Sequence, residues 1–134
     1  MGNNKKILVI DDDAKITRVL DLKLSKAGYQ VIVAANGKAG LNLFRAQRPD
    51  MVITDILMPG KDGLETIIEL RRDFPEVKIV ALSGGGHIGA DEYVDLAKKL
   101  GAQYTFTKPF TGKEILQAVT ELLDNSTGAK NTFG

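Results

Sequence analysis

Residues 6–34, KILVIDDDAKITRVLDLKLSKAGYQVIVA, contain one complete strand–helix–strand unit, and this unit decides the fold. Its first segment, residues 6–10, is an apolar run without alternation, which is typical of a strand that is covered on both faces. From Ala14 the apolar residues follow a helical period, and Gly28 stands where a helix would end. A second apolar run, residues 30–34, predicts the next strand. The unit therefore predicts two parallel strands with a helix between them.

The same alternation continues over the rest of the chain. Three more runs of apolar and β-branched residues predict strands, and helical spacing follows each of them. The predicted strands are residues 6–10, 30–34, 51–54, 78–82 and 103–107, and the predicted helices begin at or near Ala14, Lys38, Leu64, Asp91 and Thr111. Five strands that alternate with five helices indicate an α/β fold with a parallel sheet.

Right-handed crossovers and coverage of both sheet faces restrict the topology further. We predict a doubly wound five-stranded parallel sheet of order 2-1-3-4-5, the flavodoxin-like (βα)5 arrangement with helices on both faces. The apolar spacing also predicts which helix residues face the sheet. These are Ile16, Val19, Leu20 and Leu24; Ala39, Leu43 and Ala46; Leu64, Ile67, Ile68 and Arg71; and Ile115, Leu116, Val119, Leu122 and Leu123.

Length and composition indicate one domain. The 134 residues suit a single core, so we expect a domain over residues 1–124 and a disordered polar tail over residues 125–134. A net charge of +1 is too small to indicate binding to nucleic acid or to an acidic membrane surface. The sequence has no cysteine, which excludes disulfides and thiolate metal ligands. Its first apolar run is too short for a signal peptide or a membrane span, so we expect a soluble, cytoplasmic protein.

Polar residues gather at the ends of the predicted strands. The first strand is followed by three aspartates at 11–13, the third ends at Asp55, the fourth at Ser83 and the fifth at Lys108. Ligands of such sheets bind beyond the carboxyl ends of the strands, at the switch point between strands 1 and 3. Crowded carboxylates favour a hard cation such as Mg²⁺. Together with a lysine they suit phosphoryl transfer to an aspartate nucleophile.

Over about residues 6–123 the chain resembles the receiver domain of two-component response regulators. Four motifs in the correct order carry the resemblance: Ile10-Asp11-Asp12; DILMPGKDG at residues 55–63; ALSG at residues 81–84; and TKPF at residues 107–110. Each motif follows or closes a predicted strand. Their combination is much more specific than any of them alone.

The resemblance implies a role for each residue of the site. Asp55 would be the phosphoacceptor and, with Asp12 and the backbone carbonyl of Leu57, a direct ligand of Mg²⁺, for which Mn²⁺ can substitute. Asp11 would act on the metal through a bound water. Ser83 and Lys108 would hold the phosphate, and the Lys108–Pro109 peptide bond would be cis. Asp13 is expected to cap the following helix instead of joining the site.

The resemblance also implies partners. The phosphodonor would be the phosphohistidine of a histidine kinase or of a histidine phosphotransfer protein. The output would be docking onto a downstream protein through the surface of helix 4, strand 5 and helix 5, or relay of the phosphoryl group. No nucleic acid or membrane is expected, and the chain would be a monomer or weak dimer. It would catalyse only its own phosphorylation and slow autodephosphorylation.

One strand position departs from the family pattern, and one loop is rich in glycine. Receiver domains often carry an aromatic residue three positions before the lysine, and this chain has Thr105 there, between Tyr104 and Phe106. Because neighbouring strand residues face opposite ways, neither aromatic residue simply replaces the missing one. The glycine run that begins after Ser83 predicts a mobile loop, and His87 is expected to be an exposed residue in it.

Other functions are compatible with some of these residues. An aspartate-nucleophile phosphatase or phosphotransferase would need D-x-D-x-T/V after the first strand, whereas Lys15 occupies the fifth place. A flavin carrier would need a phosphate loop where three carboxylates stand, and a calcium loop would need glycine at Ile16. An interaction module with a vestigial site and a receiver fragment of a larger multidomain regulator also remain alternatives.

Overall fold

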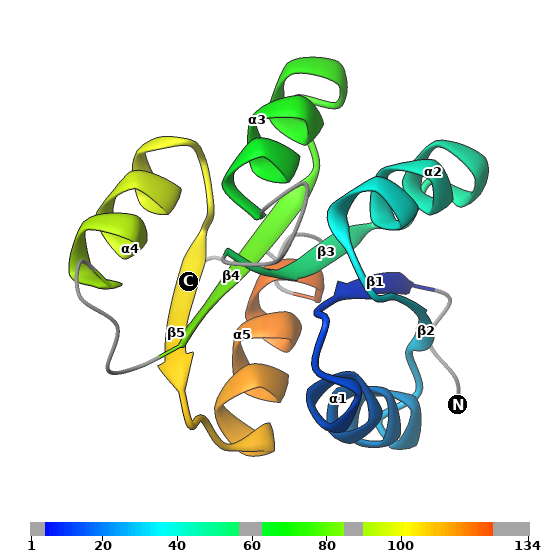
Figure 1. Cartoon of the computed structure of the whole chain (residues 1–134). Helices are drawn as coiled ribbons and strands as arrows, with labels where there is room; N and C mark the ends of the chain where they lie inside the picture. Colours follow the sequence, from blue (N-terminus) through cyan, green and yellow to red (C-terminus); the bar gives the residue numbers. More distant parts are fainter. Residues whose placement is uncertain (1–4, 57–62, 85–89, 125–134) are drawn as a thin grey trace, which may run out of the picture.

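The computed structural model describes residues 5–56, 63–84 and 90–124, and these form one five-stranded parallel sheet with helices on both faces (Figure 1). The strands are β1 (Lys6–Ile10), β2 (Gln30–Ala34), β3 (Met51–Asp55), β4 (Lys78–Gly84) and β5 (Tyr104–Lys108). The helices are α1 (Ala14–Lys26), α2 (Gly37–Gln47), α3 (Gly63–Asp73), α4 (Ala90–Lys99) and α5 (Gly112–Leu123). The strand order is β2-β1-β3-β4-β5, and it confirms the predicted topology.

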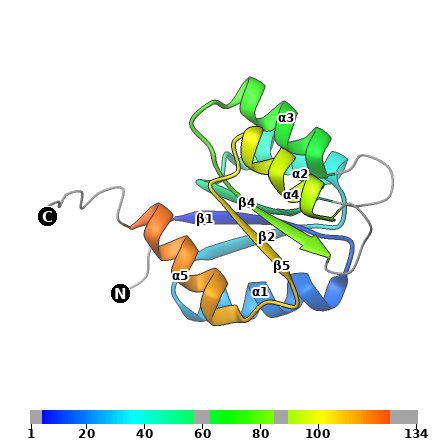
Figure 2. The ribbon, with the colours of Figure 1, turned by 90° about the vertical axis from the view of Figure 1, so that its left-hand side faces the viewer.

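Two layers of helices enclose the sheet. Helices α1 and α5 cover one face, and α2, α3 and α4 cover the other (Figure 2). Alternate residues of the inner strands enter the two cores, so that Ile7 and Val9 of β1 pack on the α1–α5 side while Leu8 and Ile10 pack on the opposite side. All four side chains are fully buried, as expected for a parallel sheet that is covered twice.

The helix ends follow from local side-chain chemistry. Asp13 is the N-cap of α1, where its carboxylate accepts a hydrogen bond from the N–H of Lys15 at 2.9 Å, and this confirms its predicted capping role. Thr111 and Glu114 form a reciprocal capping box at the start of α5. Gly28 follows α1 with a φ of 101°, a left-handed conformation that glycine adopts without a steric cost.

The predicted buried faces of three helices are partly wrong. Val19 and Ile68 are 52% and 47% exposed, and Ala46 is also exposed. A residue one position from a buried residue lies about 100° around the helix, which turns Val19 away from the face that contains Leu20. Thr17 lies three residues before Leu20 and therefore on the same side of the helix, and it is buried with Leu20 and Leu24. The corresponding buried residues are Gly40, Leu41 and Phe44 in α2, and Leu64, Thr66, Ile67 and Leu70 in α3.

β4 extends to Gly84, past the predicted end of the strand, so the prediction of a loop that begins directly after Ser83 is wrong at Gly84. Ser83 and Gly84 pair with Thr107 and Lys108 of β5 in the parallel register. The glycine at position 84 obscured this extension, because glycine is unusual inside a strand. Other parts of the predictions, namely Leu57, His87, the glycines at 85 and 86, and the tail at 125–134, lie outside the described residues. Within the described part, no helix has the length and apolar character needed to span a membrane.

Candidate functional site

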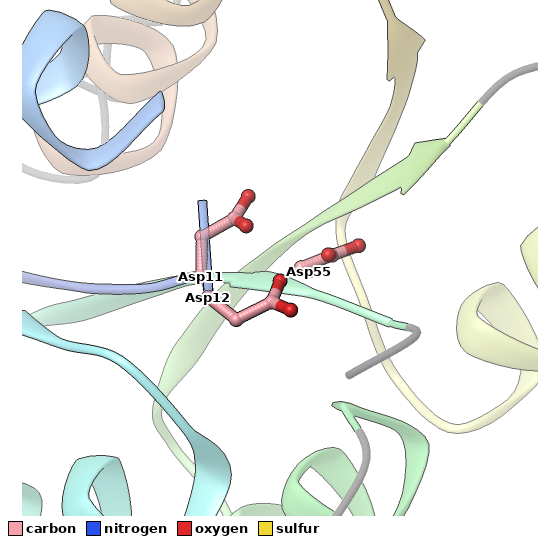
Figure 3. Close-up of side chains that lie close together, drawn as sticks. All are labelled: Asp11, Asp12 and Asp55. Atoms are coloured by element: carbon pink, nitrogen blue, oxygen red, sulfur yellow. The ribbon is translucent and has the colours of Figure 1, made fainter. Parts of the chain in front are cut away.

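The site lies where the neighbouring strands β1 and β3 end. The register places Ile10 beside Thr54, so Asp11, which follows β1, lies next to Asp55, the last residue of β3. Figure 3 shows Asp11, Asp12 and Asp55 gathered at this edge of the sheet. One carboxylate oxygen from each residue can be chosen so that all three oxygens lie within 4.8 Å of one another. The structure therefore brings together the three acidic residues predicted from the sequence.

The three carboxylates differ in exposure. Asp11 is 1% exposed and Asp55 is 5% exposed, whereas the side chain of Asp12 is exposed. The Asp11 carboxylate is held in place because its Oδ1 atom accepts a hydrogen bond from the N–H of Asp13 at 2.9 Å. The cluster therefore has two fixed, buried acids and one acid that faces solvent.

Lys108 places a cation beside the buried pair. Its Nζ atom lies 2.9 Å from Oδ2 of Asp11 and 3.4 Å from Oδ2 of Asp55. Burial disfavours the charged form, but the contact with Asp11 and the charges of Asp55 and Asp11 outweigh it, so the pKa of Lys108 is raised. Lys108 is thus held as an ammonium group facing both carboxylates. The Lys108–Pro109 peptide bond is cis, as the resemblance implied.

Ser83 adds an unused hydroxyl to this edge of the sheet. Leu82 pairs with Asp55, and Ser83 is the next residue along β4. Ser83 is 1% exposed, and its Oγ atom has no hydrogen-bond partner among the described residues. A buried hydroxyl without a partner carries a desolvation cost, which a ligand oxygen at the end of β3 would relieve.

The donor set fits Mg²⁺. It consists of carboxylate oxygens, which hard divalent cations prefer, and two of the three acids are already oriented by the fold. Asp11 and Asp55 carry two negative charges and Lys108 carries one positive charge, so one negative charge remains for a metal ion to neutralise. Asp11, Asp12 and Asp55 are therefore able to hold the metal. The predicted Leu57 ligand stays a prediction, because that residue is outside the described ranges.

Thr105 and its aromatic neighbours lie on opposite faces of β5, as alternation requires. Tyr104 and Phe106 pack into the core on the α5 side, with their ring centroids 6.2 Å apart. The Tyr104 hydroxyl donates a hydrogen bond to Glu121 of α5, which raises the pKa of Tyr104. Thr105 pairs with Ala81 of β4. No aromatic side chain therefore occupies the face of β5 on which Thr105 lies.

Sequence reasoning missed two residues behind Asp55. The hydroxyl of Thr54 donates a hydrogen bond to the Asp55 carbonyl oxygen at 3.0 Å, and Gly63 of α3 lies against the same peptide group. The threonine at position 54, near the end of an apolar strand, was only a weak signal for this hydrogen bond. The approach of Gly63 depends on how α3 docks, for which the sequence offered no direct signal.

Comparisons with known proteins agree with this geometry. Residues 7–120 match the family described as the response regulator receiver domain. The chain is 39% identical over 121 residues to a probable transcriptional regulator, ycf27, of Cyanophora paradoxa, a match that covers 90% of this chain and 49% of the relative. It is 34% identical over 120 residues to sporulation initiation phosphotransferase F of Bacillus subtilis, covering 90% of this chain and 94% of that protein.

Solved structures show the same fold. A response regulator receiver domain protein from Clostridium thermocellum superimposes with a TM-score of 0.83 at 30% identity, covering 92% of this chain and 97% of that one. The chain spans about half the length of the first curated relatives that it matches. Because the family match extends over most of the sequence, the chain belongs to the response regulator receiver domain family.

Proposed function

We propose that this domain accepts a phosphoryl group on Asp55 and transmits a signal through the phosphorylated state. The observation that carries the proposal is the place of Asp55, a buried carboxylate at a strand end that faces Asp11 and Asp12 on one side and the ammonium of Lys108 on another. Family membership supports it, because receiver domains are signalling modules rather than general catalysts.

The chemistry requires little beyond positioning and charge neutralisation. An oxygen of the Asp55 carboxylate forms a bond to phosphorus while the bond between phosphorus and the donor imidazole nitrogen breaks, and the electron pair returns to the imidazole. Lys108 and the hydroxyl of Ser83 bind the oxygens of the transferred group. Mg²⁺, or Mn²⁺ in its place, would be held by Asp12, Asp55 and the Leu57 carbonyl directly and by Asp11 through water, and it supplies positive charge for the phosphoryl oxygens.

The phosphodonor is proposed to be a histidine kinase or a histidine phosphotransfer protein. Helix α1 begins directly after the acidic cluster and carries an exposed apolar pair, Val19 and Leu22, of which Leu22 is 63% exposed. Exposed basic residues surround the pair: Lys15, Arg18, Lys23 and Lys26. Apolar surface with a charged rim, next to a reactive group, supports docking of a protein donor there.

The output is proposed to be docking onto a downstream protein, or relay, through the surface of α4, β5 and α5. A hollow of about 210 Å³ on this surface is lined by aromatic residues of β5 and by polar residues of α5: Tyr104, Phe106, Glu114, Gln117, Ala118 and Glu121. Many receiver domains carry an aromatic residue at the position of Thr105. Because Thr105 is not aromatic, phosphorylation of Asp55 would have to affect this surface without a rotamer change of an aromatic side chain there.

The proposal includes the setting of the domain. We place it in the cytoplasm as a monomer or weak dimer that binds neither nucleic acid nor membrane and catalyses only its own phosphorylation and slow autodephosphorylation. A receiver portion of a larger regulator is the second candidate, and the half-length matches to transcriptional regulators favour it. No specific observation favours a phosphatase, because Lys15 stands where the D-x-D-x-T/V run of such enzymes needs threonine or valine.

Acetyl phosphate with Mg²⁺ tests the proposal, since it supplies a phosphoryl group without a partner protein. Intact-mass measurement should show the gain of one phosphoryl group in the wild type and no gain in Asp55→Asn or in the presence of a chelator. A wild type that gains no phosphate, or an Asp55→Asn variant that gains as much, contradicts the proposal. Rapid turnover of many phosphate esters would favour the phosphatase.

A further inference from the structure

The first residue of α3 lies against the backbone of the proposed phosphoacceptor. A Cβ atom added to Gly63 would stand 2.5 Å from Cα of Ile56 and 2.7 Å from the carbonyl carbon of Asp55, and would overlap the Asp55 carbonyl oxygen. Every one of these atoms belongs to the backbone, so no side chain can rotate away. The need for glycine at this position comes from the close approach of these backbone atoms.

Neither side of this contact can move easily. On the strand side, the N–H of Ile56 donates to the carbonyl of Leu82 at 2.9 Å, and β3 is bonded to β1 and β4 on its two edges. On the helix side, α3 is anchored by fully buried Ile67 and Leu70. A methyl group at position 63 would therefore have to displace the Asp55–Ile56 backbone or tilt α3 away from it.

The same carbonyl is held from a second direction. Fully buried Thr54 donates its hydroxyl hydrogen bond to the Asp55 carbonyl oxygen at 3.0 Å. Thr54 and Gly63 thus define the orientation of the peptide group that follows the Asp55 side chain. Because the Asp55 side chain branches from the Cα atom bonded to that carbonyl carbon, the position of its carboxylate relative to Asp12 and Lys108 depends on both contacts.

We propose that Gly63 and Thr54 are positioning residues that aim the Asp55 carboxylate at the metal-binding acids and at Lys108. The inference rests on the proposed phosphoacceptor role of Asp55. Neither residue touches the reacting atoms, so each acts through Asp55. Small displacements of a reacting group are costly, and a shift of about 1 Å can reduce a rate by about a hundredfold.

Gly63→Ala is the central variant, and Gly101→Ala is its matched control. Gly101 has a φ of 113° and lies in the turn between α4 and β5, at the opposite end of the sheet from the acids, so alanine there destabilises the fold without touching Asp55. We expect Gly63→Ala to lower the rate of phosphorylation by acetyl phosphate by about tenfold or more, and to weaken Mg²⁺ binding severalfold. Gly101→Ala should lose thermal stability but keep both values within about twofold of the wild type.

Thr54 provides the second test if Gly63→Ala fails to fold. Thr54→Val keeps the shape and removes the hydroxyl, whereas Thr54→Ser keeps the hydroxyl, so only the valine variant should show the loss of rate and of Mg²⁺ affinity. Wild-type rate and affinity in both Gly63→Ala and Thr54→Val, or an equal loss in Gly101→Ala, would overturn the inference. If the wild type takes no phosphate, the proposed function fails, and the Mg²⁺ titration of the same variants then decides the positioning role by itself.

Discussion

Lys108 and Asp11 form a close ion pair across the sheet, with 2.9 Å between Nζ and Oδ2. Asp11 follows β1 and Lys108 ends β5, so the pair spans the carboxyl edge beyond the strands β3 and β4 that lie between them. The same ammonium lies 3.4 Å from Oδ2 of Asp55. Lys108 therefore partly neutralises the two buried acids before any metal or phosphate arrives.

The first prediction concerns Lys108→Met. Without the ammonium, the carboxylates of Asp11 and Asp55 repel each other in a largely buried site, and in chelator the free energy of unfolding should fall by about 1–3 kcal/mol. Mg²⁺ can replace the missing positive charge, so its addition should stabilise Lys108→Met more than the wild type. Urea unfolding with and without Mg²⁺ measures both effects. The control is Lys98→Met on the exposed surface of α4, and an equal Mg²⁺ effect in all three proteins argues against the prediction.

The second prediction concerns Ser83, whose hydroxyl should affect the stability of the unphosphorylated domain and the rate of phosphorylation differently. Its buried hydroxyl has no partner among the described residues, so Ser83→Ala should leave the unphosphorylated domain as stable as the wild type or more stable by about 1 kcal/mol. The same variant should be phosphorylated about tenfold more slowly, because the transferred group loses a donor. Ser83→Thr keeps the hydroxyl and should stay close to the wild-type rate. A large loss of stability in Ser83→Ala would mean that the hydroxyl is already satisfied.

Much of the fold could be predicted because it depends on local patterns and general connection rules. Apolar runs such as residues 6–10 mark strands that are covered twice, and the order of the sheet follows from right-handed crossovers. The acids Asp11 and Asp55 were predictable as neighbours for the same reason, because strand ends of adjacent parallel strands meet at one edge.

The remaining features depend on tertiary packing. Val19 and Ile68 are apolar residues next to buried ones, and only the docking angle of each helix decides that they face outward. The contact between Gly63 and Asp55 also depends on helix docking. A glycine at the start of a helix does not by itself indicate which backbone it lies against. The glycine after Ser83 suggested a loop, whereas pairing with Thr107 and Lys108 of β5 extends the strand.

The third prediction concerns the end of the sheet opposite the acids. Arg71 of α3 donates hydrogen bonds to the carbonyl oxygens of Pro75 at 2.7 Å, Val77 at 2.8 Å and Gly101 at 2.8 Å. Burial of its guanidinium lowers the pKa of Arg71, and the three carbonyls are its anchoring partners. Arg71→Met leaves these acceptors unpaired and should reduce the free energy of unfolding by about 2–4 kcal/mol.

Arg72 is the matched control for that variant, because it is the next residue on α3 and its side chain is exposed. Arg72→Met should lower the free energy of unfolding much less than Arg71→Met, because solvent screens the ion pair that Arg72 makes. Chemical denaturation of the two variants makes the comparison. Equal effects would show that Arg71 contributes only as a surface charge.

The last prediction follows from the pKa of Asp73. Hydrogen bonds from Arg72 and then Arg45 lower the pKa of its carboxyl from 3.8 to about 2, against an opposing effect of desolvation. Because the folded-state pKa is the lower one, the stabilising effect of these pairs is present above about pH 4 and is lost as the pH falls toward 2. A carboxyl ¹³C titration should place the midpoint of Asp73 near that value in the wild type. In Arg72→Ala the midpoint should rise toward the ordinary aspartate value, and in Arg45→Ala it should rise by less, because Arg72 makes the larger contribution. If all three proteins titrate together, the ion pairs of Asp73 with Arg72 in α3 and with Arg45 of α2 do not form in solution.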